Sequence, residues 1–313
     1  MQPSLSLNRV FRRFCSVFVA VTLTAGCAPE AVRYDGGRPV RAVCTTGMVA
    51  DVVRNVAGDR VEIRQLMGEG IDPHLFRATP DVTAEMEAAD VIFYSGLHLE
   101  GRMADLFESM AEQKPTIAAT STVRHDQLIT FGADAHDPHV WFDVALWSET
   151  VESVRRFFVE FDPAHAVDYD TRAAAYRKQL LALDAECRAR LAEIPKASRV
   201  LVTAHDAFHY FGRAYDVEVR AIQGVSTEAE AGLKELNELV EFITSHKIKA
   251  VFIETSVSDR NMKSLSDGCA AHGHKVSIGG ELFSDSMGKS GTPEGTYIGM
   301  VRHNVDVIVK ALQ

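Results

Sequence analysis

The sequence predicts an α/β protein with two doubly wound parallel-sheet lobes joined by one long, rigid helix. Two observations lead to this fold class. Short β-rich runs alternate with longer helical patterns in each half of the chain, and the longest helical pattern lies between the halves. Such alternation implies β-α-β crossovers and therefore parallel sheets. We expect an N-terminal lobe over residues 38–158, a linking helix over 162–194 and a C-terminal lobe over 198–313.

The individual elements are assigned from β-branched apolar runs for strands and from apolar residues at helical spacing for helices. The strands expected in the first half are 40–45, 61–66, 91–94 and 116–119, and the helices are 48–57, 80–88 and 102–112. The strands expected in the second half are 199–203, 217–223, 250–254 and 275–278, and the helices are 207–215, 227–246, 260–272 and 296–312.

The linking helix begins near Asp162-Pro163 and ends near Ile194-Pro195. Its apolar residues recur at helical spacing, while its other faces carry charged side chains. A helix of roughly thirty residues would span about 45 Å. Because no Gly/Ser-rich tether separates the halves, we expect modest tilting of the lobes rather than a large hinge closure.

The first residues have the pattern of an export signal. Arg9, Arg12 and Arg13 precede an apolar run over 14–23, and small residues precede Cys27. The run is about ten residues, which is too short for a membrane span. Residues 1–26 are therefore predicted to be a lipoprotein-type signal peptide, with Cys27 lipidated and the protein anchored at the membrane in the periplasm or at the cell surface. Plain cleavage and a retained signal anchor stay open as alternatives, because Thr24 stands where Leu is usual.

Charge and cysteine content exclude several classes of protein. The formal charge of −10 becomes −13 when the three arginines of residues 1–26 are removed, so nucleic acid is not expected as a partner. With 46% hydrophobic residues, the chain can bury one large or two medium cores. Past Cys27 the cysteines are Cys44, Cys187 and Cys269, which form no Cys-x-x-Cys motif, and each is predicted to be a buried free thiol.

Histidines recur in similar contexts at nearly even intervals along the chain. Each follows a predicted strand or a loop at the carboxyl end of a sheet, where loops of α/β folds converge on ligands. Three imidazoles and one carboxylate suit a borderline divalent cation, foremost zinc. The sequence therefore predicts one four-coordinate metal site from Asp72-Pro73-His74, Asp137-Pro138-His139, His205-Asp206 and the Asp285 of Leu282-Phe283-Ser284-Asp285.

Several acidic residues lie close to these histidines in the sequence. Asp72 and Asp137 either accept the second ring N–H of the neighbouring histidine or form turns, and both interpretations stay open. The same ambiguity holds for Asp143 and Asp206. Glu254 ends a predicted strand at the same rim, so it is a candidate to hold a ligand in place and not a ligand itself.

The motifs together resemble one known family. Asp72-Pro73-His74, residues 137–141, residues 203–208 and residues 279–285, in this order, are similar to the TroA-type zinc/manganese solute-binding proteins of ABC importers, and the similarity extends over about residues 40–313. The resemblance implies a monomeric binding protein, not an enzyme, that carries one zinc or manganese ion as cargo to a membrane permease. It also implies that His74, His139, His205 and Asp285 hold the ion in a cleft between the lobes.

The choice of metal is not fixed by the resemblance. Members of the family dedicated to manganese often have Glu at the third ligand, so His205 resembles the zinc or mixed subgroup, and iron stays open. Three nitrogen donors favour zinc over manganese in the Irving–Williams order. Because imidazole binds metal in its neutral form, affinity is expected to fall below about pH 6.

The chain departs from the family pattern at two places. His209 stands where a non-ligand such as Gly is expected, so it is either a packing residue or an additional ligand. The loop before His139 lacks the long His-rich insertion of many zinc binders. It still contains His125 and His136, which are either exposed loop residues or a weak auxiliary metal collector.

Two other functional classes compete with a binding protein. A secreted zinc hydrolase would need three ligands, an open water position and a carboxylate base, for which Asp285 with Glu254 or Glu281 would be the candidates. Four protein ligands leave little room for that water, and the sequence has no His-Glu-x-x-His motif. A metal-responsive surface adhesin is the third class, and no feature of the sequence supports it directly.

Overall fold

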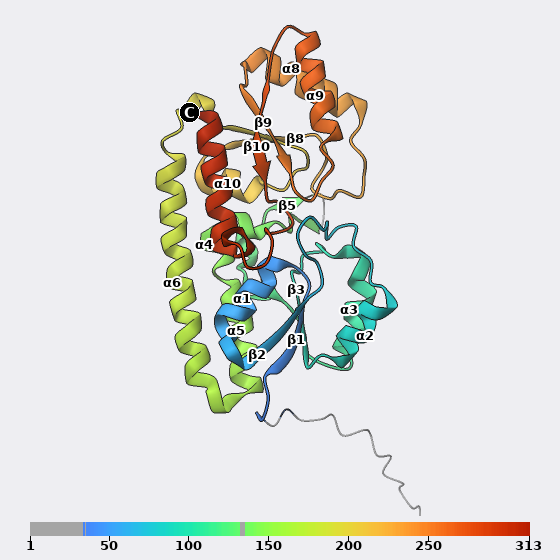
Figure 1. Cartoon of the computed structure of the whole chain (residues 1–313), viewed down its shortest axis with the longest axis vertical. Helices are drawn as coiled ribbons and strands as arrows, with labels where there is room; N and C mark the ends of the chain where they lie inside the picture. Colours follow the sequence, from blue (N-terminus) through green and yellow to red (C-terminus); the bar gives the residue numbers. More distant parts are fainter. Residues whose placement is uncertain (1–33, 35, 132–134) are drawn as a thin grey trace, which may run out of the picture. The chain divides into compact units, whose positions relative to one another are not determined.

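The computed structural model describes residue 34 and residues 36–131 and 135–313 of the chain. This part forms two α/β lobes linked by the long helix α6 (Ala166–Leu191), which confirms the predicted fold class (Figure 1). The expected export signal and Cys27 lie outside the described residues. Among the described helices, none combines the length and the apolar composition that a membrane span requires.

The first lobe is built on a four-stranded parallel sheet with the strand order β2-β1-β3-β4. β1 pairs on one side with β2 and on the other with β3, so the first strand of the chain lies inside the sheet. The strands are β1 (Val40–Cys44), β2 (Val61–Gln65), β3 (Val91–Tyr94) and β4 (Thr116–Ala118). Each agrees with its expected range to within one residue.

Helices cover both faces of this sheet because consecutive strand residues point to opposite sides. Ala42 and Phe93 pack in the cluster that contains α1 and α5, whereas Val43 and Ile92 pack with α2 and α3 (Figure 1). Thr46 caps the start of α1 by accepting the backbone N–H of the third residue along. The helices are α1 (Gly47–Ala57), α2 (Pro80–Ala88), α3 (Ala104–Ala111) and α5 (Thr150–Phe161).

The described structure has three elements that were not predicted from the sequence: α4 (Val144–Trp147), α5, and a pair of short strands, β5 (Thr130–Phe131) and β6 (Ala135–His136). α5 buries apolar residues at helical spacing, and these pack on the same core as β1 and β3. α4 is a single turn and each of these short strands has two residues, which is too short for either period to show in a sequence.

The second lobe differs from a single four-stranded sheet. Its strands are β7 (Val200–Thr203), β8 (Glu218–Ala221), β9 (Ala250–Glu254) and β10 (Ser277–Leu282). They form two parallel pairs, β7 with β8 and β9 with β10, and β7 lies beside β9 without a shared ladder. β10 continues four residues beyond its expected end, across an irregularity at Gly280, where φ is +150°.

The helices of the second lobe are α7 (His209–Tyr215), α8 (Leu233–His246), α9 (Arg260–Ala271) and α10 (Tyr297–Leu312). α8 begins six residues later than expected. Thr227 and Glu228, at the start of the expected range, instead bond to Asp72 and Arg102 of the first lobe. Contacts between the lobes thus override the helical preference of this segment.

A continuous apolar core joins the two lobes. α10 packs along α6 and also contacts α1, so the last helix of the chain touches elements of both lobes (Figure 1). One buried cluster includes Trp147 of the first lobe, Tyr176 and Leu180 of α6, and Phe208 and Tyr297 of the second lobe. Separating the lobes widely would expose this cluster to water, which favours modest tilting over a wide opening.

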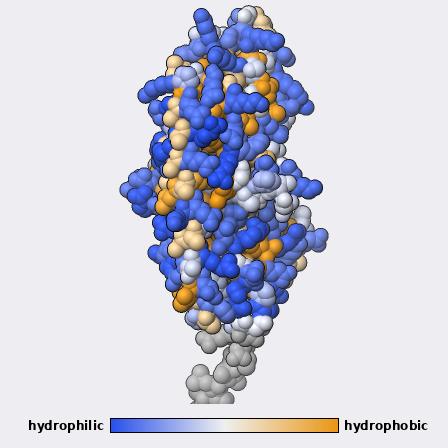
Figure 2. Space-filling view, turned by 60° about the vertical axis from the view of Figure 1, so that its left-hand side comes forward, coloured by the Kyte–Doolittle hydropathy of each residue, from blue (hydrophilic) through white to orange (hydrophobic). Residues whose placement is uncertain are grey.

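The outer surface is mainly polar on the α6 side of the molecule. Figure 2 shows hydrophilic residues over most of this face, with apolar residues in narrow patches. Val167 and Leu181 are the large apolar residues of α6 that stay exposed in the described chain. Cys44, Cys187 and Cys269 are buried free thiols, as expected.

Candidate metal centre

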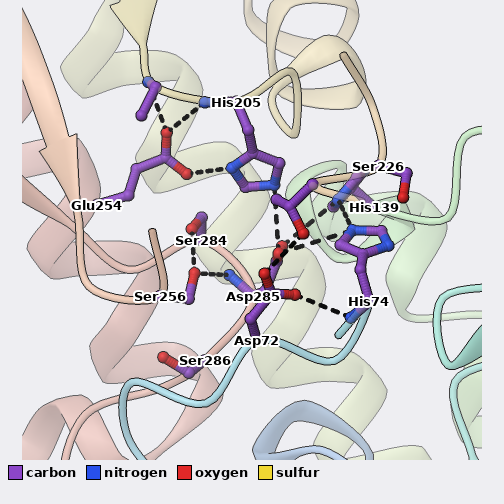
Figure 3. A network of polar contacts seen from close by, with 12 residues as sticks. Asp72, His74, His139, His205, Ser226, Glu254, Ser256, Ser284, Asp285 and Ser286 are labelled. Atoms are coloured by element: carbon purple, nitrogen blue, oxygen red, sulfur yellow. Dashed lines mark hydrogen bonds and ion pairs between the residues drawn. The ribbon is translucent and has the colours of Figure 1, made fainter. Parts of the chain in front are cut away.

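Four buried side chains meet where loops of the two lobes converge (Figure 3). His74 follows β2, His139 immediately precedes a short 3-10 turn, His205 comes two residues after β7, and Asp285 comes three residues after β10. Each side chain offers one ligand atom, and these atoms all lie within 4.8 Å of one another. The structure thus brings together the four residues that the sequence predicted to form one site.

Several distances within this group are close to the edges of a metal coordination polyhedron. Zinc lies about 2.0–2.2 Å from nitrogen or oxygen ligands, which puts neighbouring ligand atoms of a tetrahedron roughly 3.3–3.6 Å apart. Nε2 of His74 is 3.3 Å from Nε2 of His139, and Nε2 of His139 is 3.4 Å from Oδ1 of Asp285. Oδ2 of Asp285 is 3.2 Å from Nε2 of His205 and 3.7 Å from Nε2 of His74.

Unsatisfied polar atoms mark the centre of this group. Nε2 of His205 and both carboxylate oxygens of Asp285 are buried without a hydrogen-bond partner in the described chain, although the two side chains lie close enough to form an ion pair. All four side chains are at most 4% exposed. Buried polar atoms without partners are costly, and a bound cation would satisfy all three atoms at once.

His139 is held by the carboxylate of Asp137. Oδ1 of Asp137 lies 2.7 Å from Nδ1 of the ring and also accepts the backbone N–H of His139 at 2.9 Å. The donation from Nδ1 leaves Nε2 to face the other ligand candidates. Of the two interpretations left open for Asp137, the structure therefore contains both the turn and the contact with the ring.

His205 is held by Glu254 in the same manner. Oε2 of Glu254 lies 2.5 Å from Nδ1 of His205, while Oε1 accepts the backbone N–H groups of Ala204 and His205 at 2.8 and 3.0 Å. Glu254, the last residue of β9, thereby joins the end of β9 to the residues that follow β7. The prediction that Glu254 contacts a ligand candidate agrees with this geometry.

Asp72 has a different position from the one expected by analogy with Asp137. Its Oδ1 accepts the backbone N–H of His74 at 2.8 Å and makes a turn, and it does not reach the ring. Its Oδ2 accepts the hydroxyl of Thr227 at 2.6 Å, which ties the His74 loop to the second lobe. The interpretation of Asp72 as a turn former is the one the geometry supports.

For Asp143 and Asp206, which were left open in the same way, the described contacts do not include a hydrogen bond to any of the four side chains. Asp143 caps α4 by accepting the backbone N–H of Leu146 at 3.0 Å and pairs with Arg213. Asp206 is 3.1 Å from Nε2 of His209, and its Oδ1 has no hydrogen-bond partner among the described residues. Both lie near the site in the sequence, but their hydrogen-bond and ion-pair partners are other residues.

The remaining histidines of interest are not part of the group. His209 lies beside Asp137 and is not one of the clustered candidates. His125 and His136 stack edge to face with ring centroids 4.8 Å apart, and in the described chain they do not belong to any group of three potential ligands.

Two aromatic residues that were not predicted as site residues connect the loops of the site. The indole N–H of Trp141 donates to the backbone oxygen of Ser284 at 3.0 Å, so it joins the loop of His139 to the loop of Asp285. The hydroxyl of Tyr297 donates to the backbone oxygen of Trp141 at 2.7 Å. The position of Trp141, two residues after His139, is the only sequence signal for this contact.

The pKa of His74 is shifted in the opposite direction from the pKa values of the other two imidazoles. Burial lowers the pKa of His74 to about 4, so its ring is neutral at pH 7. Burial also opposes charge on His139, but the carboxylate of Asp137 outweighs it and raises the pKa of His139 to about 9. The pKa of His205 is likewise raised, because Glu254 and Asp285 outweigh the effect of burial.

The same charges act on the acidic groups. Burial alone would raise the pKa of Asp285, but the positive charges of His205 and His139 hold that pKa well below its usual range. The charge of His139 likewise overcomes burial at Asp137 and lowers its pKa to about 2. Without a metal, the neighbouring carboxylates thus favour the protonated forms of His139 and His205, whereas burial favours the neutral form of His74.

Comparison with known proteins places the chain among metal-binding relatives. It is 42% identical over 299 residues to the manganese-binding lipoprotein MntA of Bacillus subtilis, which covers 95% of this chain and 98% of the relative. It is 44% identical over 303 residues to the zinc-binding protein TroA of Treponema pallidum, covering 96% of this chain and 98% of the relative.

More distant relatives and the solved structures agree with these matches. A manganese ABC transporter substrate-binding lipoprotein, PsaA of Streptococcus mitis, is 28% identical over 318 residues, with 98% of both chains covered. The solved structure of the periplasmic zinc-binding protein TroA of Treponema pallidum superposes with a TM-score of 0.86 at 46% identity, covering 88% of this chain and 99% of that structure.

These matches confirm the resemblance found in the sequence motifs. The family model described as zinc-uptake complex component A, periplasmic, matches residues 42–311, which is most of the chain. The chain therefore belongs to the family of zinc-uptake complex component A, periplasmic.

Proposed function

We propose that the protein is an extracytoplasmic binding protein that captures one zinc or manganese ion and delivers it to the membrane permease of an ABC importer. The observation that carries this function is the group His74, His139, His205 and Asp285, whose inward-facing atoms are buried and partly without hydrogen-bond partners. Relatives over nearly the full length are named for binding manganese or zinc. Both ions accept nitrogen and oxygen donors of this kind.

The donor set favours zinc in the competition between the two ions. Three nitrogen donors and one carboxylate suit tetrahedral zinc, and affinity rises from manganese to zinc in the Irving–Williams order. Asp285 can offer either or both of its oxygens, since Oδ1 faces His139 and Oδ2 faces His205. Such a site also accepts manganese, and the supply of each ion then decides which one is carried.

Capture and release follow from where the four residues lie. His74 and His139 belong to the first lobe, and His205 and Asp285 to the second. The ion therefore bridges the lobes, and a small tilt about α6 would separate two ligands from the other two. Because the site is nearly inaccessible to water when the lobes are together, such a tilt serves both entry and delivery of the ion.

The same arrangement argues against a hydrolase. A catalytic zinc keeps a coordination position open for water or substrate. Here four protein ligand candidates surround the centre, and the side chains of His139, His205 and Asp285 are completely buried. The family consists of solute-binding proteins, which agrees with a role in transport.

A metal titration tests the binding function. The processed protein would be purified without added metal, its metal content measured by plasma mass spectrometry, and the stripped protein titrated with zinc and with manganese in competition. One tightly bound equivalent is expected, with zinc displacing manganese. His205→Ala should lose tight binding, whereas the surface variant His272→Ala should keep it. Failure of the wild-type protein to take up either ion would overturn the proposal.

A second test concerns location and partners. We expect Cys27 to carry the lipid anchor and the chain to act as a monomer, since the relatives that bind manganese are named lipoproteins. Cys27→Ala should move the protein from the membrane fraction to the soluble fraction, and light scattering should give the monomer mass. Cells without the protein should accumulate less zinc or manganese when supply is limiting. Unchanged accumulation would contradict the transport role.

A further inference from the structure

His209 occupies an unusual position at the first turn of α7. Its Nδ1 lies 3.3 Å from Oδ2 of Asp137, and its Nε2 lies 3.1 Å from Oδ1 of Asp206. The side chain is 36% exposed, whereas Asp137 is completely buried. His209 therefore stands between the buried centre and solvent, although it is not one of the four clustered side chains.

The carboxylate of Asp137 depends on this contact. Its Oδ1 is already occupied by the ring and the backbone N–H of His139. In the described part of the chain, Nδ1 of His209 is the only hydrogen-bond partner of Oδ2. Removal of His209 would leave Oδ2 buried without a hydrogen-bond donor, which is costly for a carboxylate.

We propose that His209 is a positioning residue for metal binding: its Nδ1–H fixes Asp137, and Asp137 in turn fixes the ring of His139. This inference rests on the proposed function, because it assigns a role in binding the same ion. The chain of contacts runs from His139 through Asp137 to His209 and ends at Asp206. Groups one contact removed from a metal ligand commonly set its orientation and basicity, and His209 extends this support by one further contact.

The charges around His209 agree with the direction of donation. The hydrogen bond to Asp137 raises the pKa of His209, and the carboxylate of Asp206 on its other side acts in the same direction. The charge of His139 opposes them. Arg213, one turn further along α7, donates to the backbone oxygen of Gln127 and pairs with Asp143 instead. Both ring nitrogens of His209 thus face carboxylate oxygens, which can only accept, so a proton on Nδ1 is donated to Asp137.

A matched pair of variants tests the donor directly. Asn and Leu have nearly the same shape, and the amide nitrogen of Asn can take the place of Nδ1, whereas Leu has no donor. We expect His209→Leu to weaken zinc binding about tenfold, the lower end of the range for groups that support a metal ligand. His209→Asn should restore the wild-type affinity. His272→Asn, at the exposed end of α9, is the control for loss of a surface imidazole.

A double-mutant cycle tests whether His209 acts through Asp137. If it does, adding His209→Leu to Asp137→Asn should cause no further loss of affinity, because the carboxylate that it fixes is already gone. Independent, additive losses would overturn the proposal. So would wild-type affinity in His209→Leu, or equal losses in the Leu and Asn variants.

These experiments distinguish failure of the proposed function from failure of the role assigned to His209. If His205→Ala binds zinc as tightly as the wild-type protein, the four-residue site itself is wrong. If His205→Ala loses zinc while His209→Leu does not, the site stands and only the role of His209 fails. Thermal unfolding of each metal-free variant shows whether a change in affinity comes from loss of folding instead.

Discussion

Glu254 places one carboxylate oxygen 2.5 Å from Nδ1 of His205 and the other 3.0 Å from the backbone nitrogen of the same residue. The carboxylate thus fixes both the ring and the backbone that carries it. It also lies where β7 and β9 run side by side without a ladder of their own. The candidate metal centre and the contact between the two strand pairs of the second lobe thus share one buried side chain.

Glu254→Gln should weaken zinc binding by about 10- to 100-fold, the usual range for a group that orients a metal-bound histidine. Glutamine keeps the shape but has one acceptor oxygen, so it cannot serve the ring and the two backbone N–H groups together. Competition with a chelator measures the change. Glu281→Gln, on the exposed side of the neighbouring strand β10, is the matched control and should bind zinc normally. Equal affinity of both variants would contradict the role of Glu254.

Thr227→Val should speed the release of zinc. The hydroxyl of Thr227 donates to Asp72 across the lobes at 2.6 Å, and a hydrogen bond of this kind contributes about 0.5–1.5 kcal/mol. Its loss should raise the dissociation rate by roughly two- to tenfold if separation of the lobes limits release. Stopped-flow mixing with a chelator measures the rate. Thr171→Val, on the exposed side of α6, should leave the rate unchanged.

Much of this architecture could be predicted because its signals are local. The strands of the first lobe are short β-branched runs between helical patterns, and three of the four site residues follow such strands. The late start of α8 could not be predicted, because Thr227 and Glu228 are held by partners more than a hundred residues away in the sequence. The division of the second sheet into two pairs also depends on such distant contacts.

Within the site, the roles of the acidic residues also depend on contacts between residues that are distant in the sequence. Asp137 and Asp72 stand in the same Asp-Pro-His context, yet only Asp137 reaches the ring of its histidine. The difference lies in the three-dimensional surroundings, since the outer oxygen of Asp72 is taken by Thr227 of the other lobe. A sequence motif identifies the candidate histidines, but the partners that orient them come from the packing of the lobes.

Zinc binding at pH 7 should release about two protons per ion, since each ligand must be deprotonated before it coordinates. The pKa of His139 is raised to about 9 by Asp137 against the effect of burial, and the pKa of His205 is raised in the same direction. His74, with a pKa of about 4, should contribute none. Calorimetry in buffers of different ionisation enthalpy counts the protons. A binding enthalpy independent of the buffer would contradict the protonated metal-free site.

Zinc should increase the tryptophan fluorescence of the protein. The ring of Trp141 lies edge to face with His139 at a centroid distance of 5.1 Å. A protonated imidazole in contact with an indole quenches its emission, and zinc would displace that proton. Trp141→Phe should remove the increase, while Trp147→Phe should keep it. An increase that survives in Trp141→Phe would show that the signal comes from elsewhere.

The metal-free protein should lose stability as the pH rises from about 6.5 to about 9. His139 has a pKa of about 9 in the folded protein, because Asp137 outweighs burial, and about 6.5 in the unfolded chain. Its stabilising contribution is therefore complete below about pH 6.5 and is lost as the pH passes through the folded value. His205, whose pKa is also raised, acts in the same direction. Each group changes the free energy of unfolding by up to about 1.4 kcal/mol per pH unit.

Zinc should reverse this trend, because in the bound form the ring nitrogens carry the ion instead of protons. Thermal unfolding followed by circular dichroism between pH 6.5 and 9 would compare the two forms. The melting temperature should fall with pH without zinc and hold or rise with zinc. Asp137→Asn removes the carboxylate that raises the pKa of His139, so its metal-free form should show a shallower fall. A metal-free wild-type protein that becomes more stable over this range would mean that the imidazoles of the empty site are neutral.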